Sequence, residues 1–117
     1  MQTLNELHMM LLEILYHSKE IYVCLFCILP LAAFSLQFSE IVRPCAEQIV
    51  QVIKKVLAPI GGLDESCLMY VGHWVSTLIK IGVVQGEAQQ QIVLLLASRM
   101  AKAKMASTAK VSKEIYS

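Results

Sequence analysis

The chain has 117 residues, enough for a single domain, and 56% of them are hydrophobic while only 16% are charged. Soluble domains average about 25% charged residues, and a small protein needs proportionally more polar surface than a large one. The excess of apolar side chains therefore predicts contact with lipid or with partner subunits. A net charge of +1 gives no indication of nucleic acid as a partner.

The first predicted helix begins near the N-terminus, where apolar residues recur every three or four positions from Leu4 to Leu15. No glycine or proline precedes Pro30, so this helix is expected to continue into the segment that follows it. Glu6 and Glu13 come before any lysine or arginine, whereas a cleavable signal peptide begins with basic residues. The sequence therefore predicts no cleavable signal peptide of the usual form.

The longest uncharged run lies between Glu20 and Glu40. As a helix rising about 1.5 Å per residue, this run reaches about 28 Å, close to the ~30 Å hydrocarbon core of a bilayer. We therefore predict a transmembrane helix over residues 21–38. Pro30 lacks a backbone donor and is expected to kink it.

A boundary at Ser39–Pro44 is followed by a predicted amphipathic helix at residues 44–57. Its apolar positions recur at three- and four-residue spacing and comprise Cys45, Ile49, Val52, Ile53, Val56 and Leu57. Lys54 and Lys55 are among the polar residues of the other side, and Pro59 ends the helix. We expect the apolar stripe to be buried.

A second apolar run covers residues 66–84 and holds a single charged side chain, Lys80. A lysine near a helix end can extend to the membrane surface, so this run is predicted as a second transmembrane helix. Gly86 precedes a last predicted helix, and the small polar residues 106–117 predict a flexible tail.

Together these segments predict an all-α fold of four helical segments in one domain, residues 1–117. The two spans would form a membrane-embedded helical hairpin, with amphipathic helices beside it. Outside the spans, six lysines and arginines lie near the two ends and three lie between the spans. The positive-inside rule then predicts that both termini are cytoplasmic. A single span, or a 44–57 helix lying in the membrane interface, stays open as an alternative.

Cys24 and Cys27 form the one formal motif of the chain, a CxxC whose two sulfurs share a helix face. Both flanks are apolar, and desolvation raises a thiol pKa and weakens the nucleophile. Cys45 and Cys67 stand apart from each other in the sequence. We predict four reduced, buried cysteines, and the sequence does not decide whether the CxxC has a function.

Two groups of residues are candidates for contact with a partner or with lipid. His73 and Trp74 lie within the second apolar run, where a polar ring needs a hydrogen-bond partner or a place at the headgroups. From Arg99 onward five cations face one anion, which predicts contact of Arg99, Lys102 and Lys104 with anionic lipid or an acidic partner. The alternative for these cations is an ordinary solvated helix end.

The sequence carries no nucleophile elbow, phosphate loop or paired-acid motif, so it predicts no enzyme activity, cofactor or metal. The leading hypothesis is a small helical membrane protein that is a structural or accessory subunit of a larger membrane assembly. Its partners would be lipid and other membrane subunits or copies of itself. Two alternatives are a self-assembling pilin-like or pore-forming subunit, and a soluble α-helical interaction module that is an obligate oligomer.

Overall fold

The computed structural model describes the backbone of residues 2–18, 20–58 and 67–116, and their side chains except Gln2, Ile21 and residues 103–116. Within those ranges the regular structure is helical, which confirms the predicted all-α class. The elements in chain order are α1 (Gln2–His17), α2 (Ile21–Gln37), α3 (Ser39–Val42), the 3₁₀ helix η1 (Arg43–Cys45), α4 (Ala46–Val56), α5 (Leu68–Lys80) and α6 (Gly86–Tyr116).

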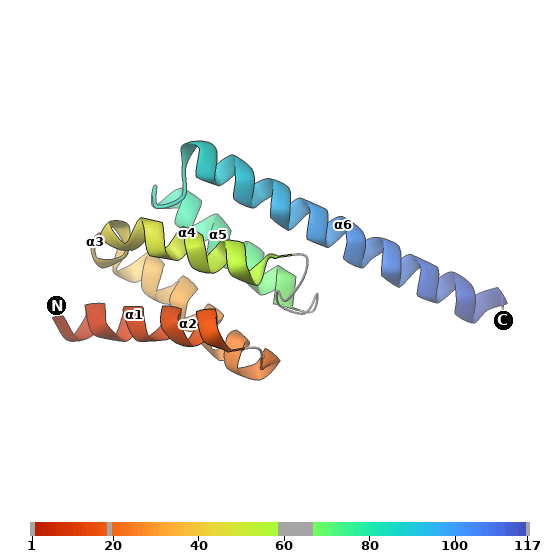
Figure 1. Cartoon of the computed structure of the whole chain (residues 1–117), viewed down its shortest axis with the longest axis horizontal. Helices are drawn as coiled ribbons and strands as arrows, with labels where there is room; N and C mark the ends of the chain where they lie inside the picture. The colour runs from red at the N-terminus through yellow and green to blue at the C-terminus, as the bar shows by residue number, and fades with distance from the viewer. Residues whose placement is uncertain (1, 19, 59–66, 117) are drawn as a thin grey trace.

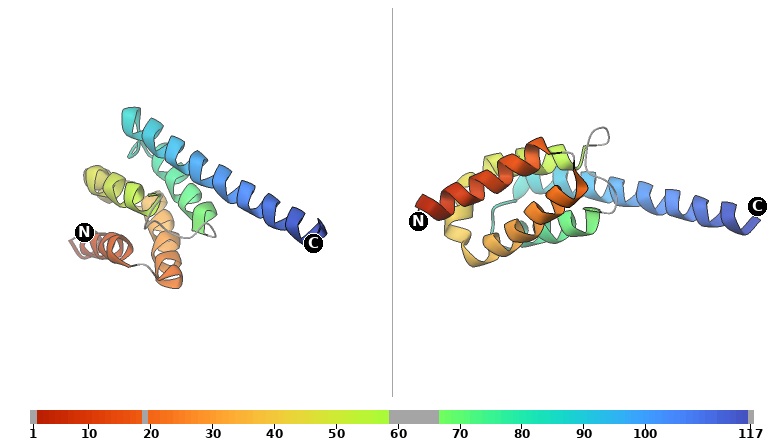
Figure 2. Two further views of the ribbon diagram at one scale, coloured as in Figure 1. Left: turned by 45° about the vertical axis from the view of Figure 1, so that its right-hand side comes forward. Right: turned by 90° about the horizontal axis from the view of Figure 1, so that it is seen from below.

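The helices stack in two layers (Figures 1 and 2). α1 and α2 pair as an antiparallel hairpin, α4 then packs on α1, and α5 packs on α2. α6 lies against both α4 and α5. One layer therefore holds α1, α4 and α6, while the other holds α2 and α5.

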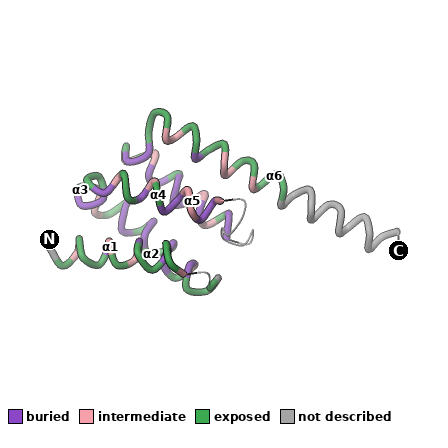
Figure 3. The backbone as a smooth tube through the Cα atoms, viewed as in Figure 1, coloured by how far each residue is buried: buried purple, intermediate pink, exposed green. Residues whose placement is uncertain are grey.

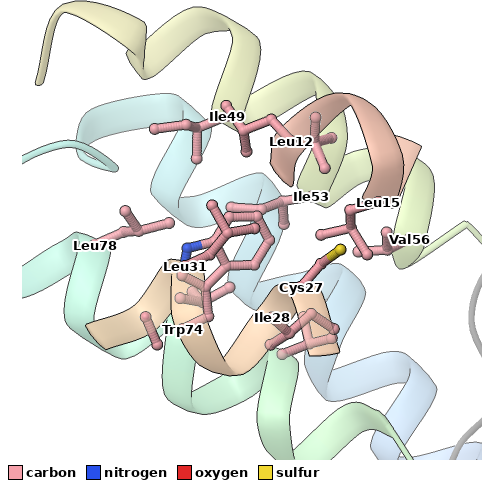
Figure 4. Packing of buried hydrophobic residues seen from close by; sticks show 14 of the residues in the cluster. Leu12, Leu15, Cys27, Ile28, Leu31, Ile49, Ile53, Val56, Trp74 and Leu78 are labelled. Atoms are coloured by element: carbon pink, nitrogen blue, oxygen red, sulfur yellow. The ribbon is translucent and has the colours of Figure 1, made fainter. Parts of the chain in front are cut away.

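The hydrophobic core lies between the two layers, and α1, α2, α4 and α5 all contribute to it (Figures 3 and 4). Leu31 of α2, Ile53 of α4 and Trp74 of α5 are fully buried. The apolar stripe predicted for residues 44–57 is buried from Cys45 through Leu57, as expected. Burial of a side chain of this size contributes about 1.5–3 kcal/mol, so these four helices hold one another in place.

The first helix ends earlier than the sequence predicts, because the helical conformation is interrupted between His17 and Ile21. The Ser18 amide still donates to the Ile14 carbonyl at 2.9 Å. The Ser18 hydroxyl, however, accepts the backbone N–H of Glu20 at 3.2 Å. Serine hydroxyls that bond to neighbouring backbone groups compete with helix continuation. This break lets α2 fold back along α1, and α2 itself continues through Pro30.

The predicted spans at residues 21–38 and 66–84 fall on α2 and α5. Among the residues that the structure describes, no single helix has the length and apolar character to cross a membrane. Tyr22–Gln37 and Ser39–Val56 meet that requirement only as a pair, which is bent by 109°. α2 and α5 lie side by side but run in the same direction (Figure 1). They therefore do not form the predicted hairpin, and α2 pairs antiparallel with α1 instead.

The last helix is longer than expected. α6 continues to Tyr116 and projects beyond the stack (Figure 1), and the flexibility expected for residues 106–117 stays a prediction. No glycine or proline follows Gly86, so nothing in the backbone chemistry interrupts the helix. Gly86 itself has a φ of 64°, a left-handed conformation that glycine adopts without strain.

Candidate interaction surface

One side of α2 packs into the core and the other is apolar but uncovered. The inward side carries Cys24, Cys27, Ile28, Leu31, Ala32, Phe34 and Ser35. The outward side carries Tyr22, Phe26, Leu29, Ala33 and Leu36, all exposed. Spacings of four, three, four and three residues align these five in one stripe along the helix. Tyr22 is 72% exposed and Phe26 is 76% exposed, values that are unusual for such large apolar side chains.

α1 carries a second exposed apolar stripe, made of Leu7, Met10 and Ile14. Glu13 and Tyr16 lie on the side of α1 that faces α4. Because successive helix positions are about 100° apart, the stripe of Leu7, Met10 and Ile14 lies on the side of α1 turned away from α4. We name the two stripes together the α1–α2 apolar face: Leu7, Met10 and Ile14 of α1 with Tyr22, Phe26, Leu29, Ala33 and Leu36 of α2.

The position of this face explains why it is uncovered. α1 and α2 are the first hairpin of the stack, and within the described chain no other helix lies on their outer side (Figure 2). α4 packs on α1 and α5 packs on α2 from the inner side. α2 has no charged residue along its length, so the exposed stripe has no acidic or basic side chain within it.

A groove of about 390 Å³ lies between α1 and α4. Its lining residues combine an apolar floor with a polar rim and are Met9, Leu12, Glu13, Tyr16, His17, Gln48, Gln51 and Val52. The ammonium of Lys55 lies 4.3 Å from the centroid of the Tyr16 ring, close enough for a cation–π contact. The volume is at the lower end of the ~300–1,000 Å³ of small-molecule sites. This groove can therefore receive a small amphipathic group at most.

His73 and Trp74, which the sequence predicts as one contact pair, lie in different environments. His73 is exposed on α5. Trp74 is fully buried in the core, and its indole N–H has no hydrogen-bond partner in the described structure. Of the two, only His73 is on the surface and available to a partner.

The three predicted basic contact residues also differ from one another. Arg99 is half-buried and donates from Nη1 to the Ala58 carbonyl at 2.9 Å, which ties α6 to the end of α4. The sequence signal for this bond is the set of unsatisfied carbonyls at a helix C-terminus, and contact of Arg99 with anionic lipid or an acidic partner stays a prediction. Lys102 is exposed, and the side chain of Lys104 lies outside the described residues.

The four cysteines are buried, as the sequence predicts. Burial raises the pKa of the Cys24, Cys27 and Cys45 thiols, so these thiols are protonated and weakly nucleophilic near neutral pH. The Cys24 thiol lies 3.7 Å from the Ser18 carbonyl oxygen, to which it donates. In the part of the chain that the structure describes, no three His, Cys, Asp or Glu side chains gather as a metal-binding set.

His8 was not predicted as a notable residue, yet it is the histidine in the core. Its side chain is fully buried, and neither ring nitrogen has a hydrogen-bond partner in the described structure. The ring stacks on Phe34 with centroids 5.2 Å apart. The sequence contained a signal for this burial, because His8, Leu12 and Leu15 are spaced as one helix face.

Comparison of the chain with protein-family models, with curated proteins and with solved structures gives no match.

Proposed function

We propose that the protein is a non-catalytic helical subunit that assembles with other protein through the α1–α2 apolar face. The observation that carries this proposal is the stripe from Tyr22 to Leu36, whose large apolar side chains are exposed in one line on an uncharged helix. Contiguous exposed apolar patches on monomeric proteins rarely exceed a few hundred Å², and larger ones mark interaction sites.

The stacked architecture supports the same proposal. Stacks of helical pairs grow by burying the apolar face of one pair against the next, and their ends carry polar outer faces when they are exposed to water. The outer side of α2 lacks such a polar face, and α1 adds three exposed apolar side chains, Leu7, Met10 and Ile14, beside the exposed polar residues Thr3 and Glu6. A protein surface of matching apolar character would complete this end of the stack.

The proposal is tested by photo-crosslinking in cells that express the full chain. Phe26 is replaced by p-benzoylphenylalanine in one variant, and Met69, which is 72% exposed on α5, is replaced in a matched control. We expect a protein adduct on irradiation of the Phe26 variant and none from the Met69 variant. The absence of any protein adduct at position 26, with both variants expressed and folded, contradicts the proposal.

A second candidate is the sequence-based one, a structural or accessory subunit of a membrane assembly. The uncharged length of α2 and the bent pair Tyr22–Gln37 and Ser39–Val56 support it. In this case the exposed stripe contacts acyl chains. We then expect the protein to stay with membranes in alkaline carbonate, and Ala33→Arg to reduce insertion by ~2.5–3.5 kcal/mol if the site is at mid-bilayer. Release of the wild-type protein by carbonate rejects this candidate.

A further inference from the structure

We propose that the partner on the α1–α2 apolar face is a second copy of this chain, with the two α2 helices packed antiparallel about a two-fold axis. The inference rests on the function proposed above and names the partner for it. In this arrangement Leu29 of each copy packs beside Ala33 of the other, and Phe26 packs beside Leu36. The class of assembly is an isologous dimer, in which both copies use the same surface.

The spacing of the stripe fits helix pairing. Tyr22, Phe26, Leu29, Ala33 and Leu36 alternate between steps of four and three residues, which is the repeat of side chains that pack knobs into holes between two helices. The stripe therefore follows the axis of α2, and its part from Phe26 to Leu36 can pair with the same part of a second copy.

The sizes of the side chains select the antiparallel direction. Well-packed interfaces place large residues opposite small ones. An antiparallel pair sets the small Ala33 against Leu29 and separates the two Phe26 rings. A parallel pair sets Phe26 against Phe26 and Ala33 against Ala33, which crowds one layer and leaves a gap in another.

The charges are compatible with a two-fold contact. A two-fold contact brings like residues of the two copies near one another, so a charge near the axis meets its own copy. No charged residue lies between Glu20 and Glu40, and the stripe itself is uncharged. Antiparallel packing at this register places Glu20 of one copy near Glu40 of the other at the ends of the interface, and parallel packing places like glutamates side by side, so the charges do not distinguish the two directions.

The area is sufficient for a dimer. An aromatic side chain presents about 150–250 Å², so Tyr22 and Phe26 at roughly three-quarters exposure offer about 300 Å² together. With Leu29, Ala33 and Leu36, the stripe of α2 is on the order of 600 Å² per copy. Two copies then bury about 1,200 Å², the lower end of specific protein interfaces.

The first test measures the mass of the purified full chain by sedimentation equilibrium. We expect twice the chain mass of 13.1 kDa at micromolar concentration. Phe26→Glu should raise the dimer dissociation constant at least about thirty-fold, as loss of an interface hot spot does. Met69→Glu, on an equally exposed apolar residue outside the face, should leave it unchanged. Helical circular dichroism and the emission of Trp74, the only tryptophan, verify that both variants fold.

The second test determines the direction of packing with a short bis-maleimide. We mix a Phe26→Cys chain with a Leu36→Cys chain and expect cross-linked heterodimers. The Phe26→Cys chain alone should not cross-link, because position 26 of one copy lies opposite position 36 of the other. The two introduced cysteines are then ten residues apart along the antiparallel helices, which is about 15 Å. The four native cysteines are buried, so the wild-type chain is the negative control.

Three results overturn the inference. A wild-type chain that is monomeric at all concentrations excludes the second copy, and if that monomer binds neutral vesicles through Phe26, lipid is the occupant instead. A dimer unaffected by Phe26→Glu excludes this face. Cross-linking of the Phe26→Cys chain with itself excludes the antiparallel direction. A monomeric chain that still forms a protein adduct at position 26 in cells leaves the proposed function intact with a different partner.

Discussion

At the scale of single residues, the most unusual group is the imidazole of His8. It is fully buried against Phe34 and its two nitrogens have no hydrogen-bond partner in the described structure. Burial lowers the pKa of His8 below its ordinary value of 6.5, because the charged form loses its hydration. The side chain is therefore held neutral and packs as an aromatic ring.

This burial predicts a loss of stability on acidification. The folded pKa of His8 is below the unfolded one, so the unfolded chain binds more protons as the pH falls below about 6.5. The stability that neutral, buried His8 contributes is fully present above that pH. It is lost below that pH, where the free energy of unfolding falls by at most about 1.4 kcal/mol per pH unit. Urea unfolding between pH 5 and 7.5 measures it. His8→Leu should flatten the dependence, whereas the exposed His73→Gln should not; equal slopes in both variants contradict the prediction.

The histidines also show which side-chain environments the sequence pattern encodes, and contact of His73 with a partner stays a prediction. His73 was singled out because it lies in an apolar run, but α5 presents it to the surface while its neighbour Trp74 enters the core. A run in which nearly every residue is apolar has no polar face to indicate its orientation, so the packing of α2 and α4 decides it. His8 lies in a segment with clear helical periodicity, so its burial could have been predicted from the spacing, although it was not.

At the scale of elements, the amphipathic helix and the uncharged helix behave differently. The buried face of α4 could be predicted because Lys54 and Lys55 mark the other side. The exposed stripe of α2 could not, since both sides of that helix are apolar and its outer side is defined only by the absence of a covering helix. The end of α1 was missed for a local reason, the hydrogen bond from the Glu20 amide to the Ser18 hydroxyl.

The basic end of α6 gives a prediction at this scale. Lys102 is exposed, and three further lysines follow it in the sequence at 104, 110 and 113. Each lysine near an anionic membrane surface contributes about 1 kcal/mol, and salt screens this attraction. We expect the full chain to bind anionic vesicles more tightly than neutral ones at low salt and to lose the difference at high salt.

The matched control replaces these four lysines with glutamine and leaves Lys54 and Lys55 unchanged. This variant should bind both kinds of vesicle equally. If the wild-type chain already shows no preference for anionic vesicles at low salt, the end of α6 is an ordinary solvated helix terminus.

At the scale of the whole molecule, the two-layer stack could not be predicted from the sequence. The elements were largely recognised, but the direction in which α2 and α5 pack depends on long-range contacts that periodicity does not encode. In the described part of the chain no helix covers the outer side of α1 and α2, which is likewise a property of the assembled stack. For this reason the sequence indicated an excess of apolar surface without locating it.

The stack predicts a gradient of local stability along the chain. α2 packs against both α1 and α5, whereas α6 is anchored by Ile92 and by the hydrogen bond from Arg99 to Ala58. Helices with few buried contacts open locally at less than the global unfolding free energy. Hydrogen exchange should therefore be slowest in α2 and fastest in α6 beyond Arg99. Binding of a second copy should slow hydrogen exchange in α1 and α2 further, because a partner that binds only the folded state stabilises that state. Protection of α1 and α2 should rise with protein concentration in the wild-type chain and stay constant in Phe26→Glu. Exchange in the end of α6 as slow as in α2 would mean that this helix has a partner too.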